Sequence, residues 1–221
     1  MAANEPTVGN DVKETGRVES FSDGVFSVAI TLLILNIVSP THLLTDSDLL
    51  RYLGSQWPAY LAYITSFATI GVMWINHHRL FTHIKLIDVN LMGLNLLLML
   101  IIVAIPFPTG LMAQYLLRTD QHVAAILYNG MNVVLALCFN LLWRYATHEN
   151  RLLGNKIDTK EVQAIHDQYR FGPLFYLVTM LIAFISAPVS IALDLLLAIF
   201  FALPGNRVQS LFRIKQSSKH V

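Results

Sequence analysis

The sequence is poor in charged side chains. Asp, Glu, Lys and Arg make up 13% of its 221 residues, against roughly 25% in an average soluble domain. Because 55% of the residues are hydrophobic, this composition excludes an ordinary soluble protein and predicts an integral membrane protein. The formal net charge of +1 also lacks the basic excess of a nucleic-acid-binding protein, so we expect no nucleic-acid partner.

Cysteine is almost absent as well. Cys138 is the single cysteine, so no disulfide can form within the chain, and its apolar surroundings predict a small buried hydrophobe. His77, His78 and His83 are close in sequence, but no HExxH spacing or second cysteine accompanies them. We therefore expect no metal site and no cofactor. The first 16 residues lack the basic start and short apolar core of a signal peptide.

Long apolar runs are abundant, and six of them can cross a hydrocarbon core of about 30 Å. The predicted spans are residues 18–38, 57–76, 86–105, 122–145, 172–187 and 189–203. We thus expect an all-α membrane domain of six helices over 17–204, between a polar N-terminus (1–16) and a basic tail (205–221). An amphipathic interfacial helix capped by Asp46 or Ser47 is expected after the first span. Pro106 to Gly110 are expected to close the third.

Basic residues are distributed unevenly on this map. With the N-terminus inside, all of the 15 lysines and arginines except Arg51 and Arg118 fall on the cytoplasmic side. Cytoplasmic segments of membrane proteins carry such an excess. The distribution therefore predicts an even number of spans and two cytoplasmic termini in a multi-pass cell-membrane protein.

The first predicted helix combines an apolar face with polar residues. At about 100° per residue, seven side chains fall within about 60° of Val28. These are Phe21, Gly24, Val25, Val28, Thr31, Leu32 and Leu35. Asp23 lies about 140° from Val28, so its carboxylate cannot share the narrow face that Val28 would present to a central axis.

A carboxylate at membrane depth needs a partner, because an unpaired buried charge costs several kcal/mol. Arg17 is six residues before Asp23 and is not its neighbour on the helix. The partner should come from another span. His77, His78 and Arg79 at the end of the second span reach the same depth, as does Asn90 in the third. We therefore predict a polar lock that joins Arg17, Ser22 and Asp23 to those two helices.

Arg17, Phe21, Ser22, Asp23 and Gly24, followed by VFSVAITLLIL, resemble the signature of the transmembrane-protein-175 family of potassium channels. Trp74, His77 and His78 match as well. Six spans in 221 residues fit the single-repeat prokaryotic form, which points to the prokaryotic inner membrane. From residue 111 onward the likeness is one of topology alone.

The resemblance implies a homotetramer in which the first helices line a pore for passive potassium conduction, without a backbone-carbonyl filter. Constriction positions would fall on Val28, Thr31, Leu32 and Leu35, with Val28 where an isoleucine is usual. Arg17, Ser22, Asp23, Trp74 and His77 would form an interhelical network rather than ion ligands. A ring of aliphatic side chains cannot coordinate a cation, so it would act as a dewetting barrier.

Two other functions stay open at this point. A secondary transporter or proton-coupled carrier would show inverted repeats and interrupted helices, and the clear interruptions here are at Pro106 and Pro188. An intramembrane enzyme using His77, His78 and either Asp23 or Asp88 would need a nucleophile or metal constellation that the sequence does not display. We place the cation channel first, with monovalent cations, the bilayer and copies of itself as partners.

Overall fold

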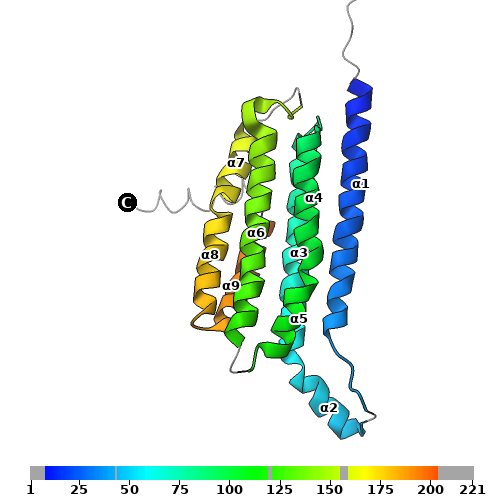
Figure 1. The fold of residues 1–221 in the computed structure, drawn as a ribbon, viewed down its shortest axis with the longest axis vertical. Helices are drawn as coiled ribbons and strands as arrows, with labels where there is room; N and C mark the ends of the chain where they lie inside the picture. The colour runs from blue at the N-terminus through cyan, green and yellow to red at the C-terminus, as the bar shows by residue number, and fades with distance from the viewer. Residues whose placement is uncertain (1–7, 43, 119–120, 155–158, 204–221) are drawn as a thin grey trace, which may run out of the picture.

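The computed structural model describes residues 8–42, 44–118, 121–154 and 159–203. Within these residues the chain is almost entirely helical, and the helices form an elongated bundle (Figure 1). The helices are α1 (Val8–Leu32), η1 (Leu33–Asn36), α2 (Asp46–Ser55), α3 (Trp57–His83), α4 (Val89–Ala104), α5 (Pro106–Tyr115), α6 (Gln121–Thr147), η2 (His148–Asn150), α7 (Thr159–Arg170), α8 (Gly172–Ala183) and α9 (Ala187–Ala202). The predicted all-α class is confirmed, whereas the predicted tail at 205–221 lies outside the described residues.

Four helical stretches are long and apolar enough to cross a membrane. They are Thr15–Asn36, Trp57–His83, Val89–Tyr115 and Gln121–Asn150. The two last helices are shorter, with 12 residues in α8 and 16 in α9, and the rise of about 1.5 Å per residue gives each less than the bilayer thickness. A multi-pass membrane protein is thus confirmed, while the six crossings and the cytoplasmic termini stay predictions.

Two helix ends differ from those predicted. Thr45 caps α2 in place of Asp46 or Ser47, because its hydroxyl oxygen accepts a hydrogen bond from the Asp48 N–H at 3.4 Å. Pro106 does not close the third span either, since α4 gives way directly to α5, which begins at Pro106. A proline in the first turn of a helix gives up an N–H that has no intrahelical partner there. The same residue can therefore end one helix and begin the next.

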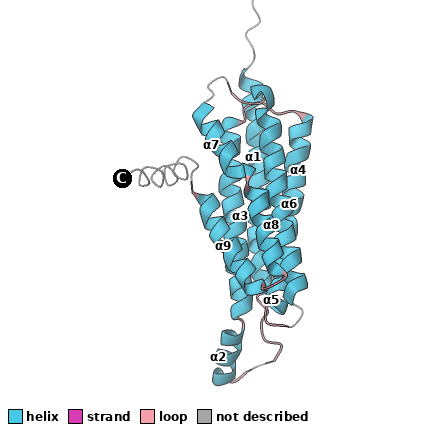
Figure 2. Cartoon of the chain, turned by 90° about the vertical axis from the view of Figure 1, so that its left-hand side faces the viewer, coloured by secondary structure: helices cyan, strands magenta, loops and turns pink. Residues whose placement is uncertain are grey.

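The core of the bundle lies around α6, and α1 stands at its edge (Figure 1). α6 packs against α4, α5 and α8, while α3 packs against α5 and α9. Trp143 and Tyr176 are among the largest side chains that are fully buried between these helices. α1 packs against α3 and α4, and in the view turned by 90° it overlaps the other helices (Figure 2). One side of α1 is consequently left uncovered in a single protomer.

The turn between α3 and α4 is held from two directions. The backbone N–H groups of Lys85 and Leu86 both donate to the carbonyl oxygen of Leu152, at 2.9 and 3.2 Å. Tyr145 donates its hydroxyl to one carboxylate oxygen of Asp88 at 2.6 Å, and the other oxygen accepts from the Leu91 N–H of α4 at 2.7 Å. Burial alone would raise the pKa of Asp88, but these hydrogen bonds and nearby Arg151 hold it below its ordinary value.

Tyr145→Phe should lower the stability of this turn in a pH-dependent way. The loss at pH 7 should be about 1 kcal/mol, the usual net value of one hydrogen bond. Because the folded-state pKa of Asp88 lies below its unfolded value, its contribution is present at neutral pH and disappears as pH falls through the folded pKa. The difference in melting temperature between the variant and the wild type, measured in detergent, should therefore shrink on acidification.

Tyr115→Phe is the control for this comparison. It also removes a tyrosine hydroxyl, but Tyr115 lies at the far end of the stretch Val89–Tyr115, away from Asp88. A Tyr145→Phe deficit that stays the same from neutral to strongly acidic pH would contradict the role of the Asp88 carboxylate.

Candidate functional site

The two sides of α1 differ sharply in exposure. Ser22, Phe26 and Ala29 are at most 1% exposed and pack into the bundle, and Leu33 of η1 continues this line. The opposite side carries most of the predicted apolar face, with Val28 54% and Leu35 72% exposed. Its other exposed members are Phe21, Gly24, Thr31 and Leu32, whereas Val25 is half-buried against the core. The constriction residues predicted from the sequence thus lie on the uncovered side of the helix.

The outer part of this face is wound differently from the prediction. The α-helix ends at Leu32, and Leu33 to Asn36 form a 3₁₀ helix. In a 3₁₀ helix, side chains three residues apart eclipse each other. Leu35 therefore lies over Leu32, about 40° from the line of Val28, whereas uniform 100° spacing places it about 20° away on the other side.

Behind the exposed face, a buried chain of hydrogen bonds joins α1, α4 and α3. Asn95 of α4 donates through Nδ2 to Ser22 Oγ at 3.0 Å, and His77 Nε2 of α3 donates to Asn95 Oδ1 at 2.8 Å. All three side chains are at most 2% exposed. The His77 ring is held between Phe26, in an edge-to-face contact, and Phe81, in a stacked one. Buried polar groups stabilise a unique packing when they are paired in this way, so this chain fixes the position of α1.

Asp23 has a partner on a different side of the helix. Trp74 donates through Nε1 to Asp23 Oδ1 at 2.8 Å, and its ring stacks on His78. Trp74 is 43% exposed, so this pair lies at the surface of the protomer, next to the buried chain but not part of it. The carboxylate was expected to find its partner on the second or third span, and the contact that the structure contains is with Trp74 of α3.

Arg17 and Asn90 were also predicted to join the lock. Both are exposed in the protomer, and Arg17 lines an open groove between α1 and α4 together with Phe21 and Asp88. No hydrogen bond links either residue to Ser22 or Asp23 among the described residues. Their place in the network therefore stays a prediction.

Asn95, five residues after Asn90, is the asparagine of α4 that bonds to Ser22. Depth in the membrane alone does not distinguish two residues so close on one helix. The spacing of α4 carries the missing signal, because Leu91, Asn95, Leu98 and Ile102 follow a helical repeat of three and four. All four are buried, so the apolar stripe of α4 identifies which asparagine faces the bundle.

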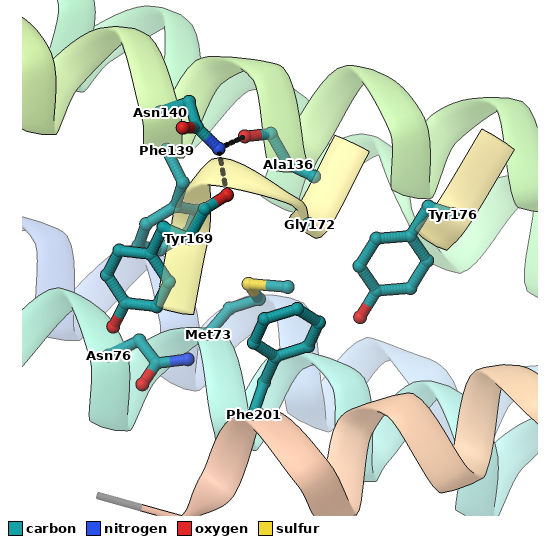
Figure 3. Close-up of a pocket in the computed structure, with 9 residues that line it drawn as sticks. All are labelled: Met73, Asn76, Ala136, Phe139, Asn140, Tyr169, Gly172, Tyr176 and Phe201. Carbon is teal, nitrogen blue, oxygen red and sulfur yellow. Dashed lines mark hydrogen bonds between the residues drawn. The ribbon is translucent and has the colours of Figure 1, made fainter. Parts of the chain in front are cut away.

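A second hollow lies away from α1, between α3, α6, α8 and α9 (Figure 3). Asn140 borders it and donates to the carbonyl oxygen of Tyr169 at 2.6 Å. Aromatic rings and Met73 supply most of the lining, and no charged side chain takes part. The described residues also contain no group of three His, Cys, Asp or Glu side chains that could hold a metal ion. The hollow therefore offers little to attract a cation.

Known proteins similar to this chain are ion channels, named as potassium channels in bacteria and as endosomal/lysosomal proton channels in vertebrates. Residues 17–106 match the family model described as endosomal/lysosomal potassium channel TMEM175. A potassium channel of Chamaesiphon minutus is 48% identical over 194 residues, which cover 87% of this chain and 96% of the relative. A potassium channel of Streptomyces collinus is 43% identical over 194 residues, with 86% and 92% covered.

The fold has a solved counterpart. The crystal structure of a lysosomal potassium-selective channel TMEM175 homologue from Chamaesiphon minutus matches this chain with a TM-score of 0.79 and 45% sequence identity. The match covers 88% of this chain and 99% of the other.

Proposed function

Since the chain belongs to the TMEM175 family, a family of ion channels rather than enzymes, we propose that it is a potassium channel with a pore lined by α1. The exposed apolar side of α1 is the observation that carries the second half of this proposal. Val28 and Leu35 on this face are more than half exposed in a single protomer. In an assembly of four copies around a common axis, this face would line the space at the axis. The protein would act as a passive conductor in the cell membrane, as a homotetramer.

In that arrangement, Val28, Thr31, Leu32 and Leu35 would form the constriction. Aliphatic side chains cannot replace the water molecules around a cation, so the barrier depends on how readily an ion sheds its hydration shell. Potassium dehydrates more readily than sodium, which favours potassium. Thr31 adds a hydroxyl at the narrow part, although this hydroxyl donates to the carbonyl oxygen of Val28 at 2.9 Å and offers the ion only its lone pairs.

The polar contacts behind α1 would then have a mechanical role. Asn95 ties the helix to α4 and, through His77, to α3, at the level of Ser22. The Trp74–Asp23 pair lies at the protomer surface, where a neighbouring subunit would pass. We assign these residues to holding the pore helix in place and at the right distance from the axis, and not to ion coordination.

Potassium flux into liposomes reconstituted with the purified protein tests the proposal. In a Cys138→Ser background, Val28→Cys and Leu35→Cys should conduct potassium in preference to sodium, and a water-soluble thiol reagent should block that flux. Ala29→Cys is the matched control, because Ala29 lies on the same helix but is fully buried. Its flux should continue in the presence of the reagent.

Block through Ala29→Cys as strong as through Val28→Cys would remove α1 from the pore. Silent liposomes with verified insertion would instead favour a carrier that needs a coupling ion.

A further inference from the structure

The outer end of α1 is held by one side chain against the backbone of another helix. Asn36, the last residue of η1, donates through Nδ2 to the carbonyl oxygen of Pro106 at 3.0 Å. Its side chain also rests on Gly110 one turn further along α5. A Cβ atom at Gly110 would lie 2.5 Å from Asn36 Oδ1 and 3.3 Å from Asn36 Cγ, so a residue with no side chain is needed for this contact.

The contact between Asn36 and Pro106 lies at the end of η1, a 3₁₀ helix that other contacts must stabilise. A 3₁₀ helix has poorer hydrogen-bond geometry than an α-helix, and runs longer than three or four residues are uncommon. The backbone of η1 is closed by the Ile37 N–H, which donates to the carbonyl oxygen of Ile34 at 3.0 Å. Beyond it, Tyr52 of α2 donates its hydroxyl to the carbonyl oxygen of Val38 at 2.7 Å. The segment after Leu32 is therefore held at two points by other helices.

Winding decides where Leu35 lies relative to the inner constriction residues. From Leu32 to Leu35, a 3₁₀ helix turns about 60° more than an α-helix and rises about 1.5 Å more. With the observed winding, Leu35 eclipses Leu32. If η1 became α-helical, Leu35 would move inward along the helix and rotate to within about 20° of Val28.

We propose that Asn36 is a positioning residue for the pore, which sets the place of the Leu35 side chains by holding η1 in its 3₁₀ form. This inference rests on the proposed channel function. Gly110 is its counterpart on α5, because it provides the space for the Asn36 side chain. Loss of the contact frees the outer end of α1 to rewind as an α-helix, which moves four Leu35 side chains from about 40° to about 20° from the line of Val28, and inward along the helix, and so narrows the pore.

Gly110→Ala tests this without a change in α1. The added methyl group displaces the Asn36 side chain, and potassium flux should fall about tenfold, equivalent to about 1.4 kcal/mol on the barrier. Leu35→Ala in the same chain should restore the flux, because a small side chain at position 35 does not obstruct the pore in either winding. A general loss of structure would not be rescued by shortening a pore residue.

Asn36→Leu, which keeps the size of the side chain but removes the hydrogen bond, serves as a second variant and should reproduce both results. Unchanged flux in both variants would overturn the inference, as would an equal loss with and without Leu35→Ala. Absence of potassium flux in the wild type would instead reject the proposed function. Size-exclusion profiles and melting temperatures of all variants show whether each is folded.

Discussion

Asn95→Leu is expected to destabilise the protein by about 2–5 kcal/mol and to loosen α1 from the bundle. Asn95 pairs at once with Ser22 and His77, which are themselves fully buried. Leucine has a similar size but no polar atom, so His77 loses its hydrogen-bond partner, and Ser22 keeps only the bond that it donates to the Val18 carbonyl oxygen at 2.9 Å. Each buried polar group left without a partner costs about 1–3 kcal/mol. The measurement is thermal unfolding in detergent, with the oligomeric state followed by size exclusion.

Asn90→Leu is the matched control for this prediction. It makes the same chemical change on the same helix, but Asn90 is exposed, and substitutions at such sites usually stay within about 0.5 kcal/mol. If the two variants are equally unstable, the buried chain from α1 to α3 has no special role. A larger effect at Asn90 would support its predicted part in the lock.

The second large effect is expected from Leu35→Ala. Leu35 is the most exposed aliphatic member of the predicted constriction, at 72%, and its side chain should form the outermost hydrophobic ring. Shortening it widens the ring and lets ions pass with more of their hydration water. Potassium conductance should therefore rise severalfold, and the preference for potassium over sodium should fall, in single-channel recordings of the reconstituted protein.

Ile34→Ala makes a comparable change one residue earlier. Ile34 is also exposed, at 51%, but it points about 120° away from Leu35 in the 3₁₀ segment. Its conductance and selectivity should stay close to those of the wild type. Equal effects at both positions, or none at Leu35, would rule out the assignment of this ring.

Features that depend on local pattern could be predicted from the sequence. The apolar periodicity of α1 identified the exposed face, and the depth of Asp23 pointed to a partner at the end of the second span, where Trp74 lies. The choice between Asn90 and Asn95 required the register of α4 as well as its depth. Pro106 was misleading because a proline looks the same after a helix end as in the first turn of a new helix.

The winding of η1 had no local signal at all. Leu33 to Asn36 are ordinary helix-compatible residues, and the contact that accompanies their 3₁₀ form joins Asn36 to Pro106, 70 positions away. The N-terminal cap of α2 had no distinguishing signal either. Thr45, Asp46 and Ser47 all carry a side-chain oxygen that could accept a hydrogen bond from a backbone N–H in the first turn, and Thr45 is the one that does so. A tertiary contact accompanies the winding of η1, whereas the backbone conformation at Thr45 decides the cap of α2. A single sequence reveals neither.

The distance along the chain between Ser22 and Asn95, 73 positions, also has a consequence for synthesis. α1 leaves the ribosome before the residue that secures it exists. At about 5–20 residues per second, the newly inserted helix waits about 4–15 s with Ser22 and Asp23 facing lipid or the insertion machinery. During this interval the helix lacks its interhelical hydrogen bonds, and chains that stop before α4 should be the ones that quality-control proteases remove.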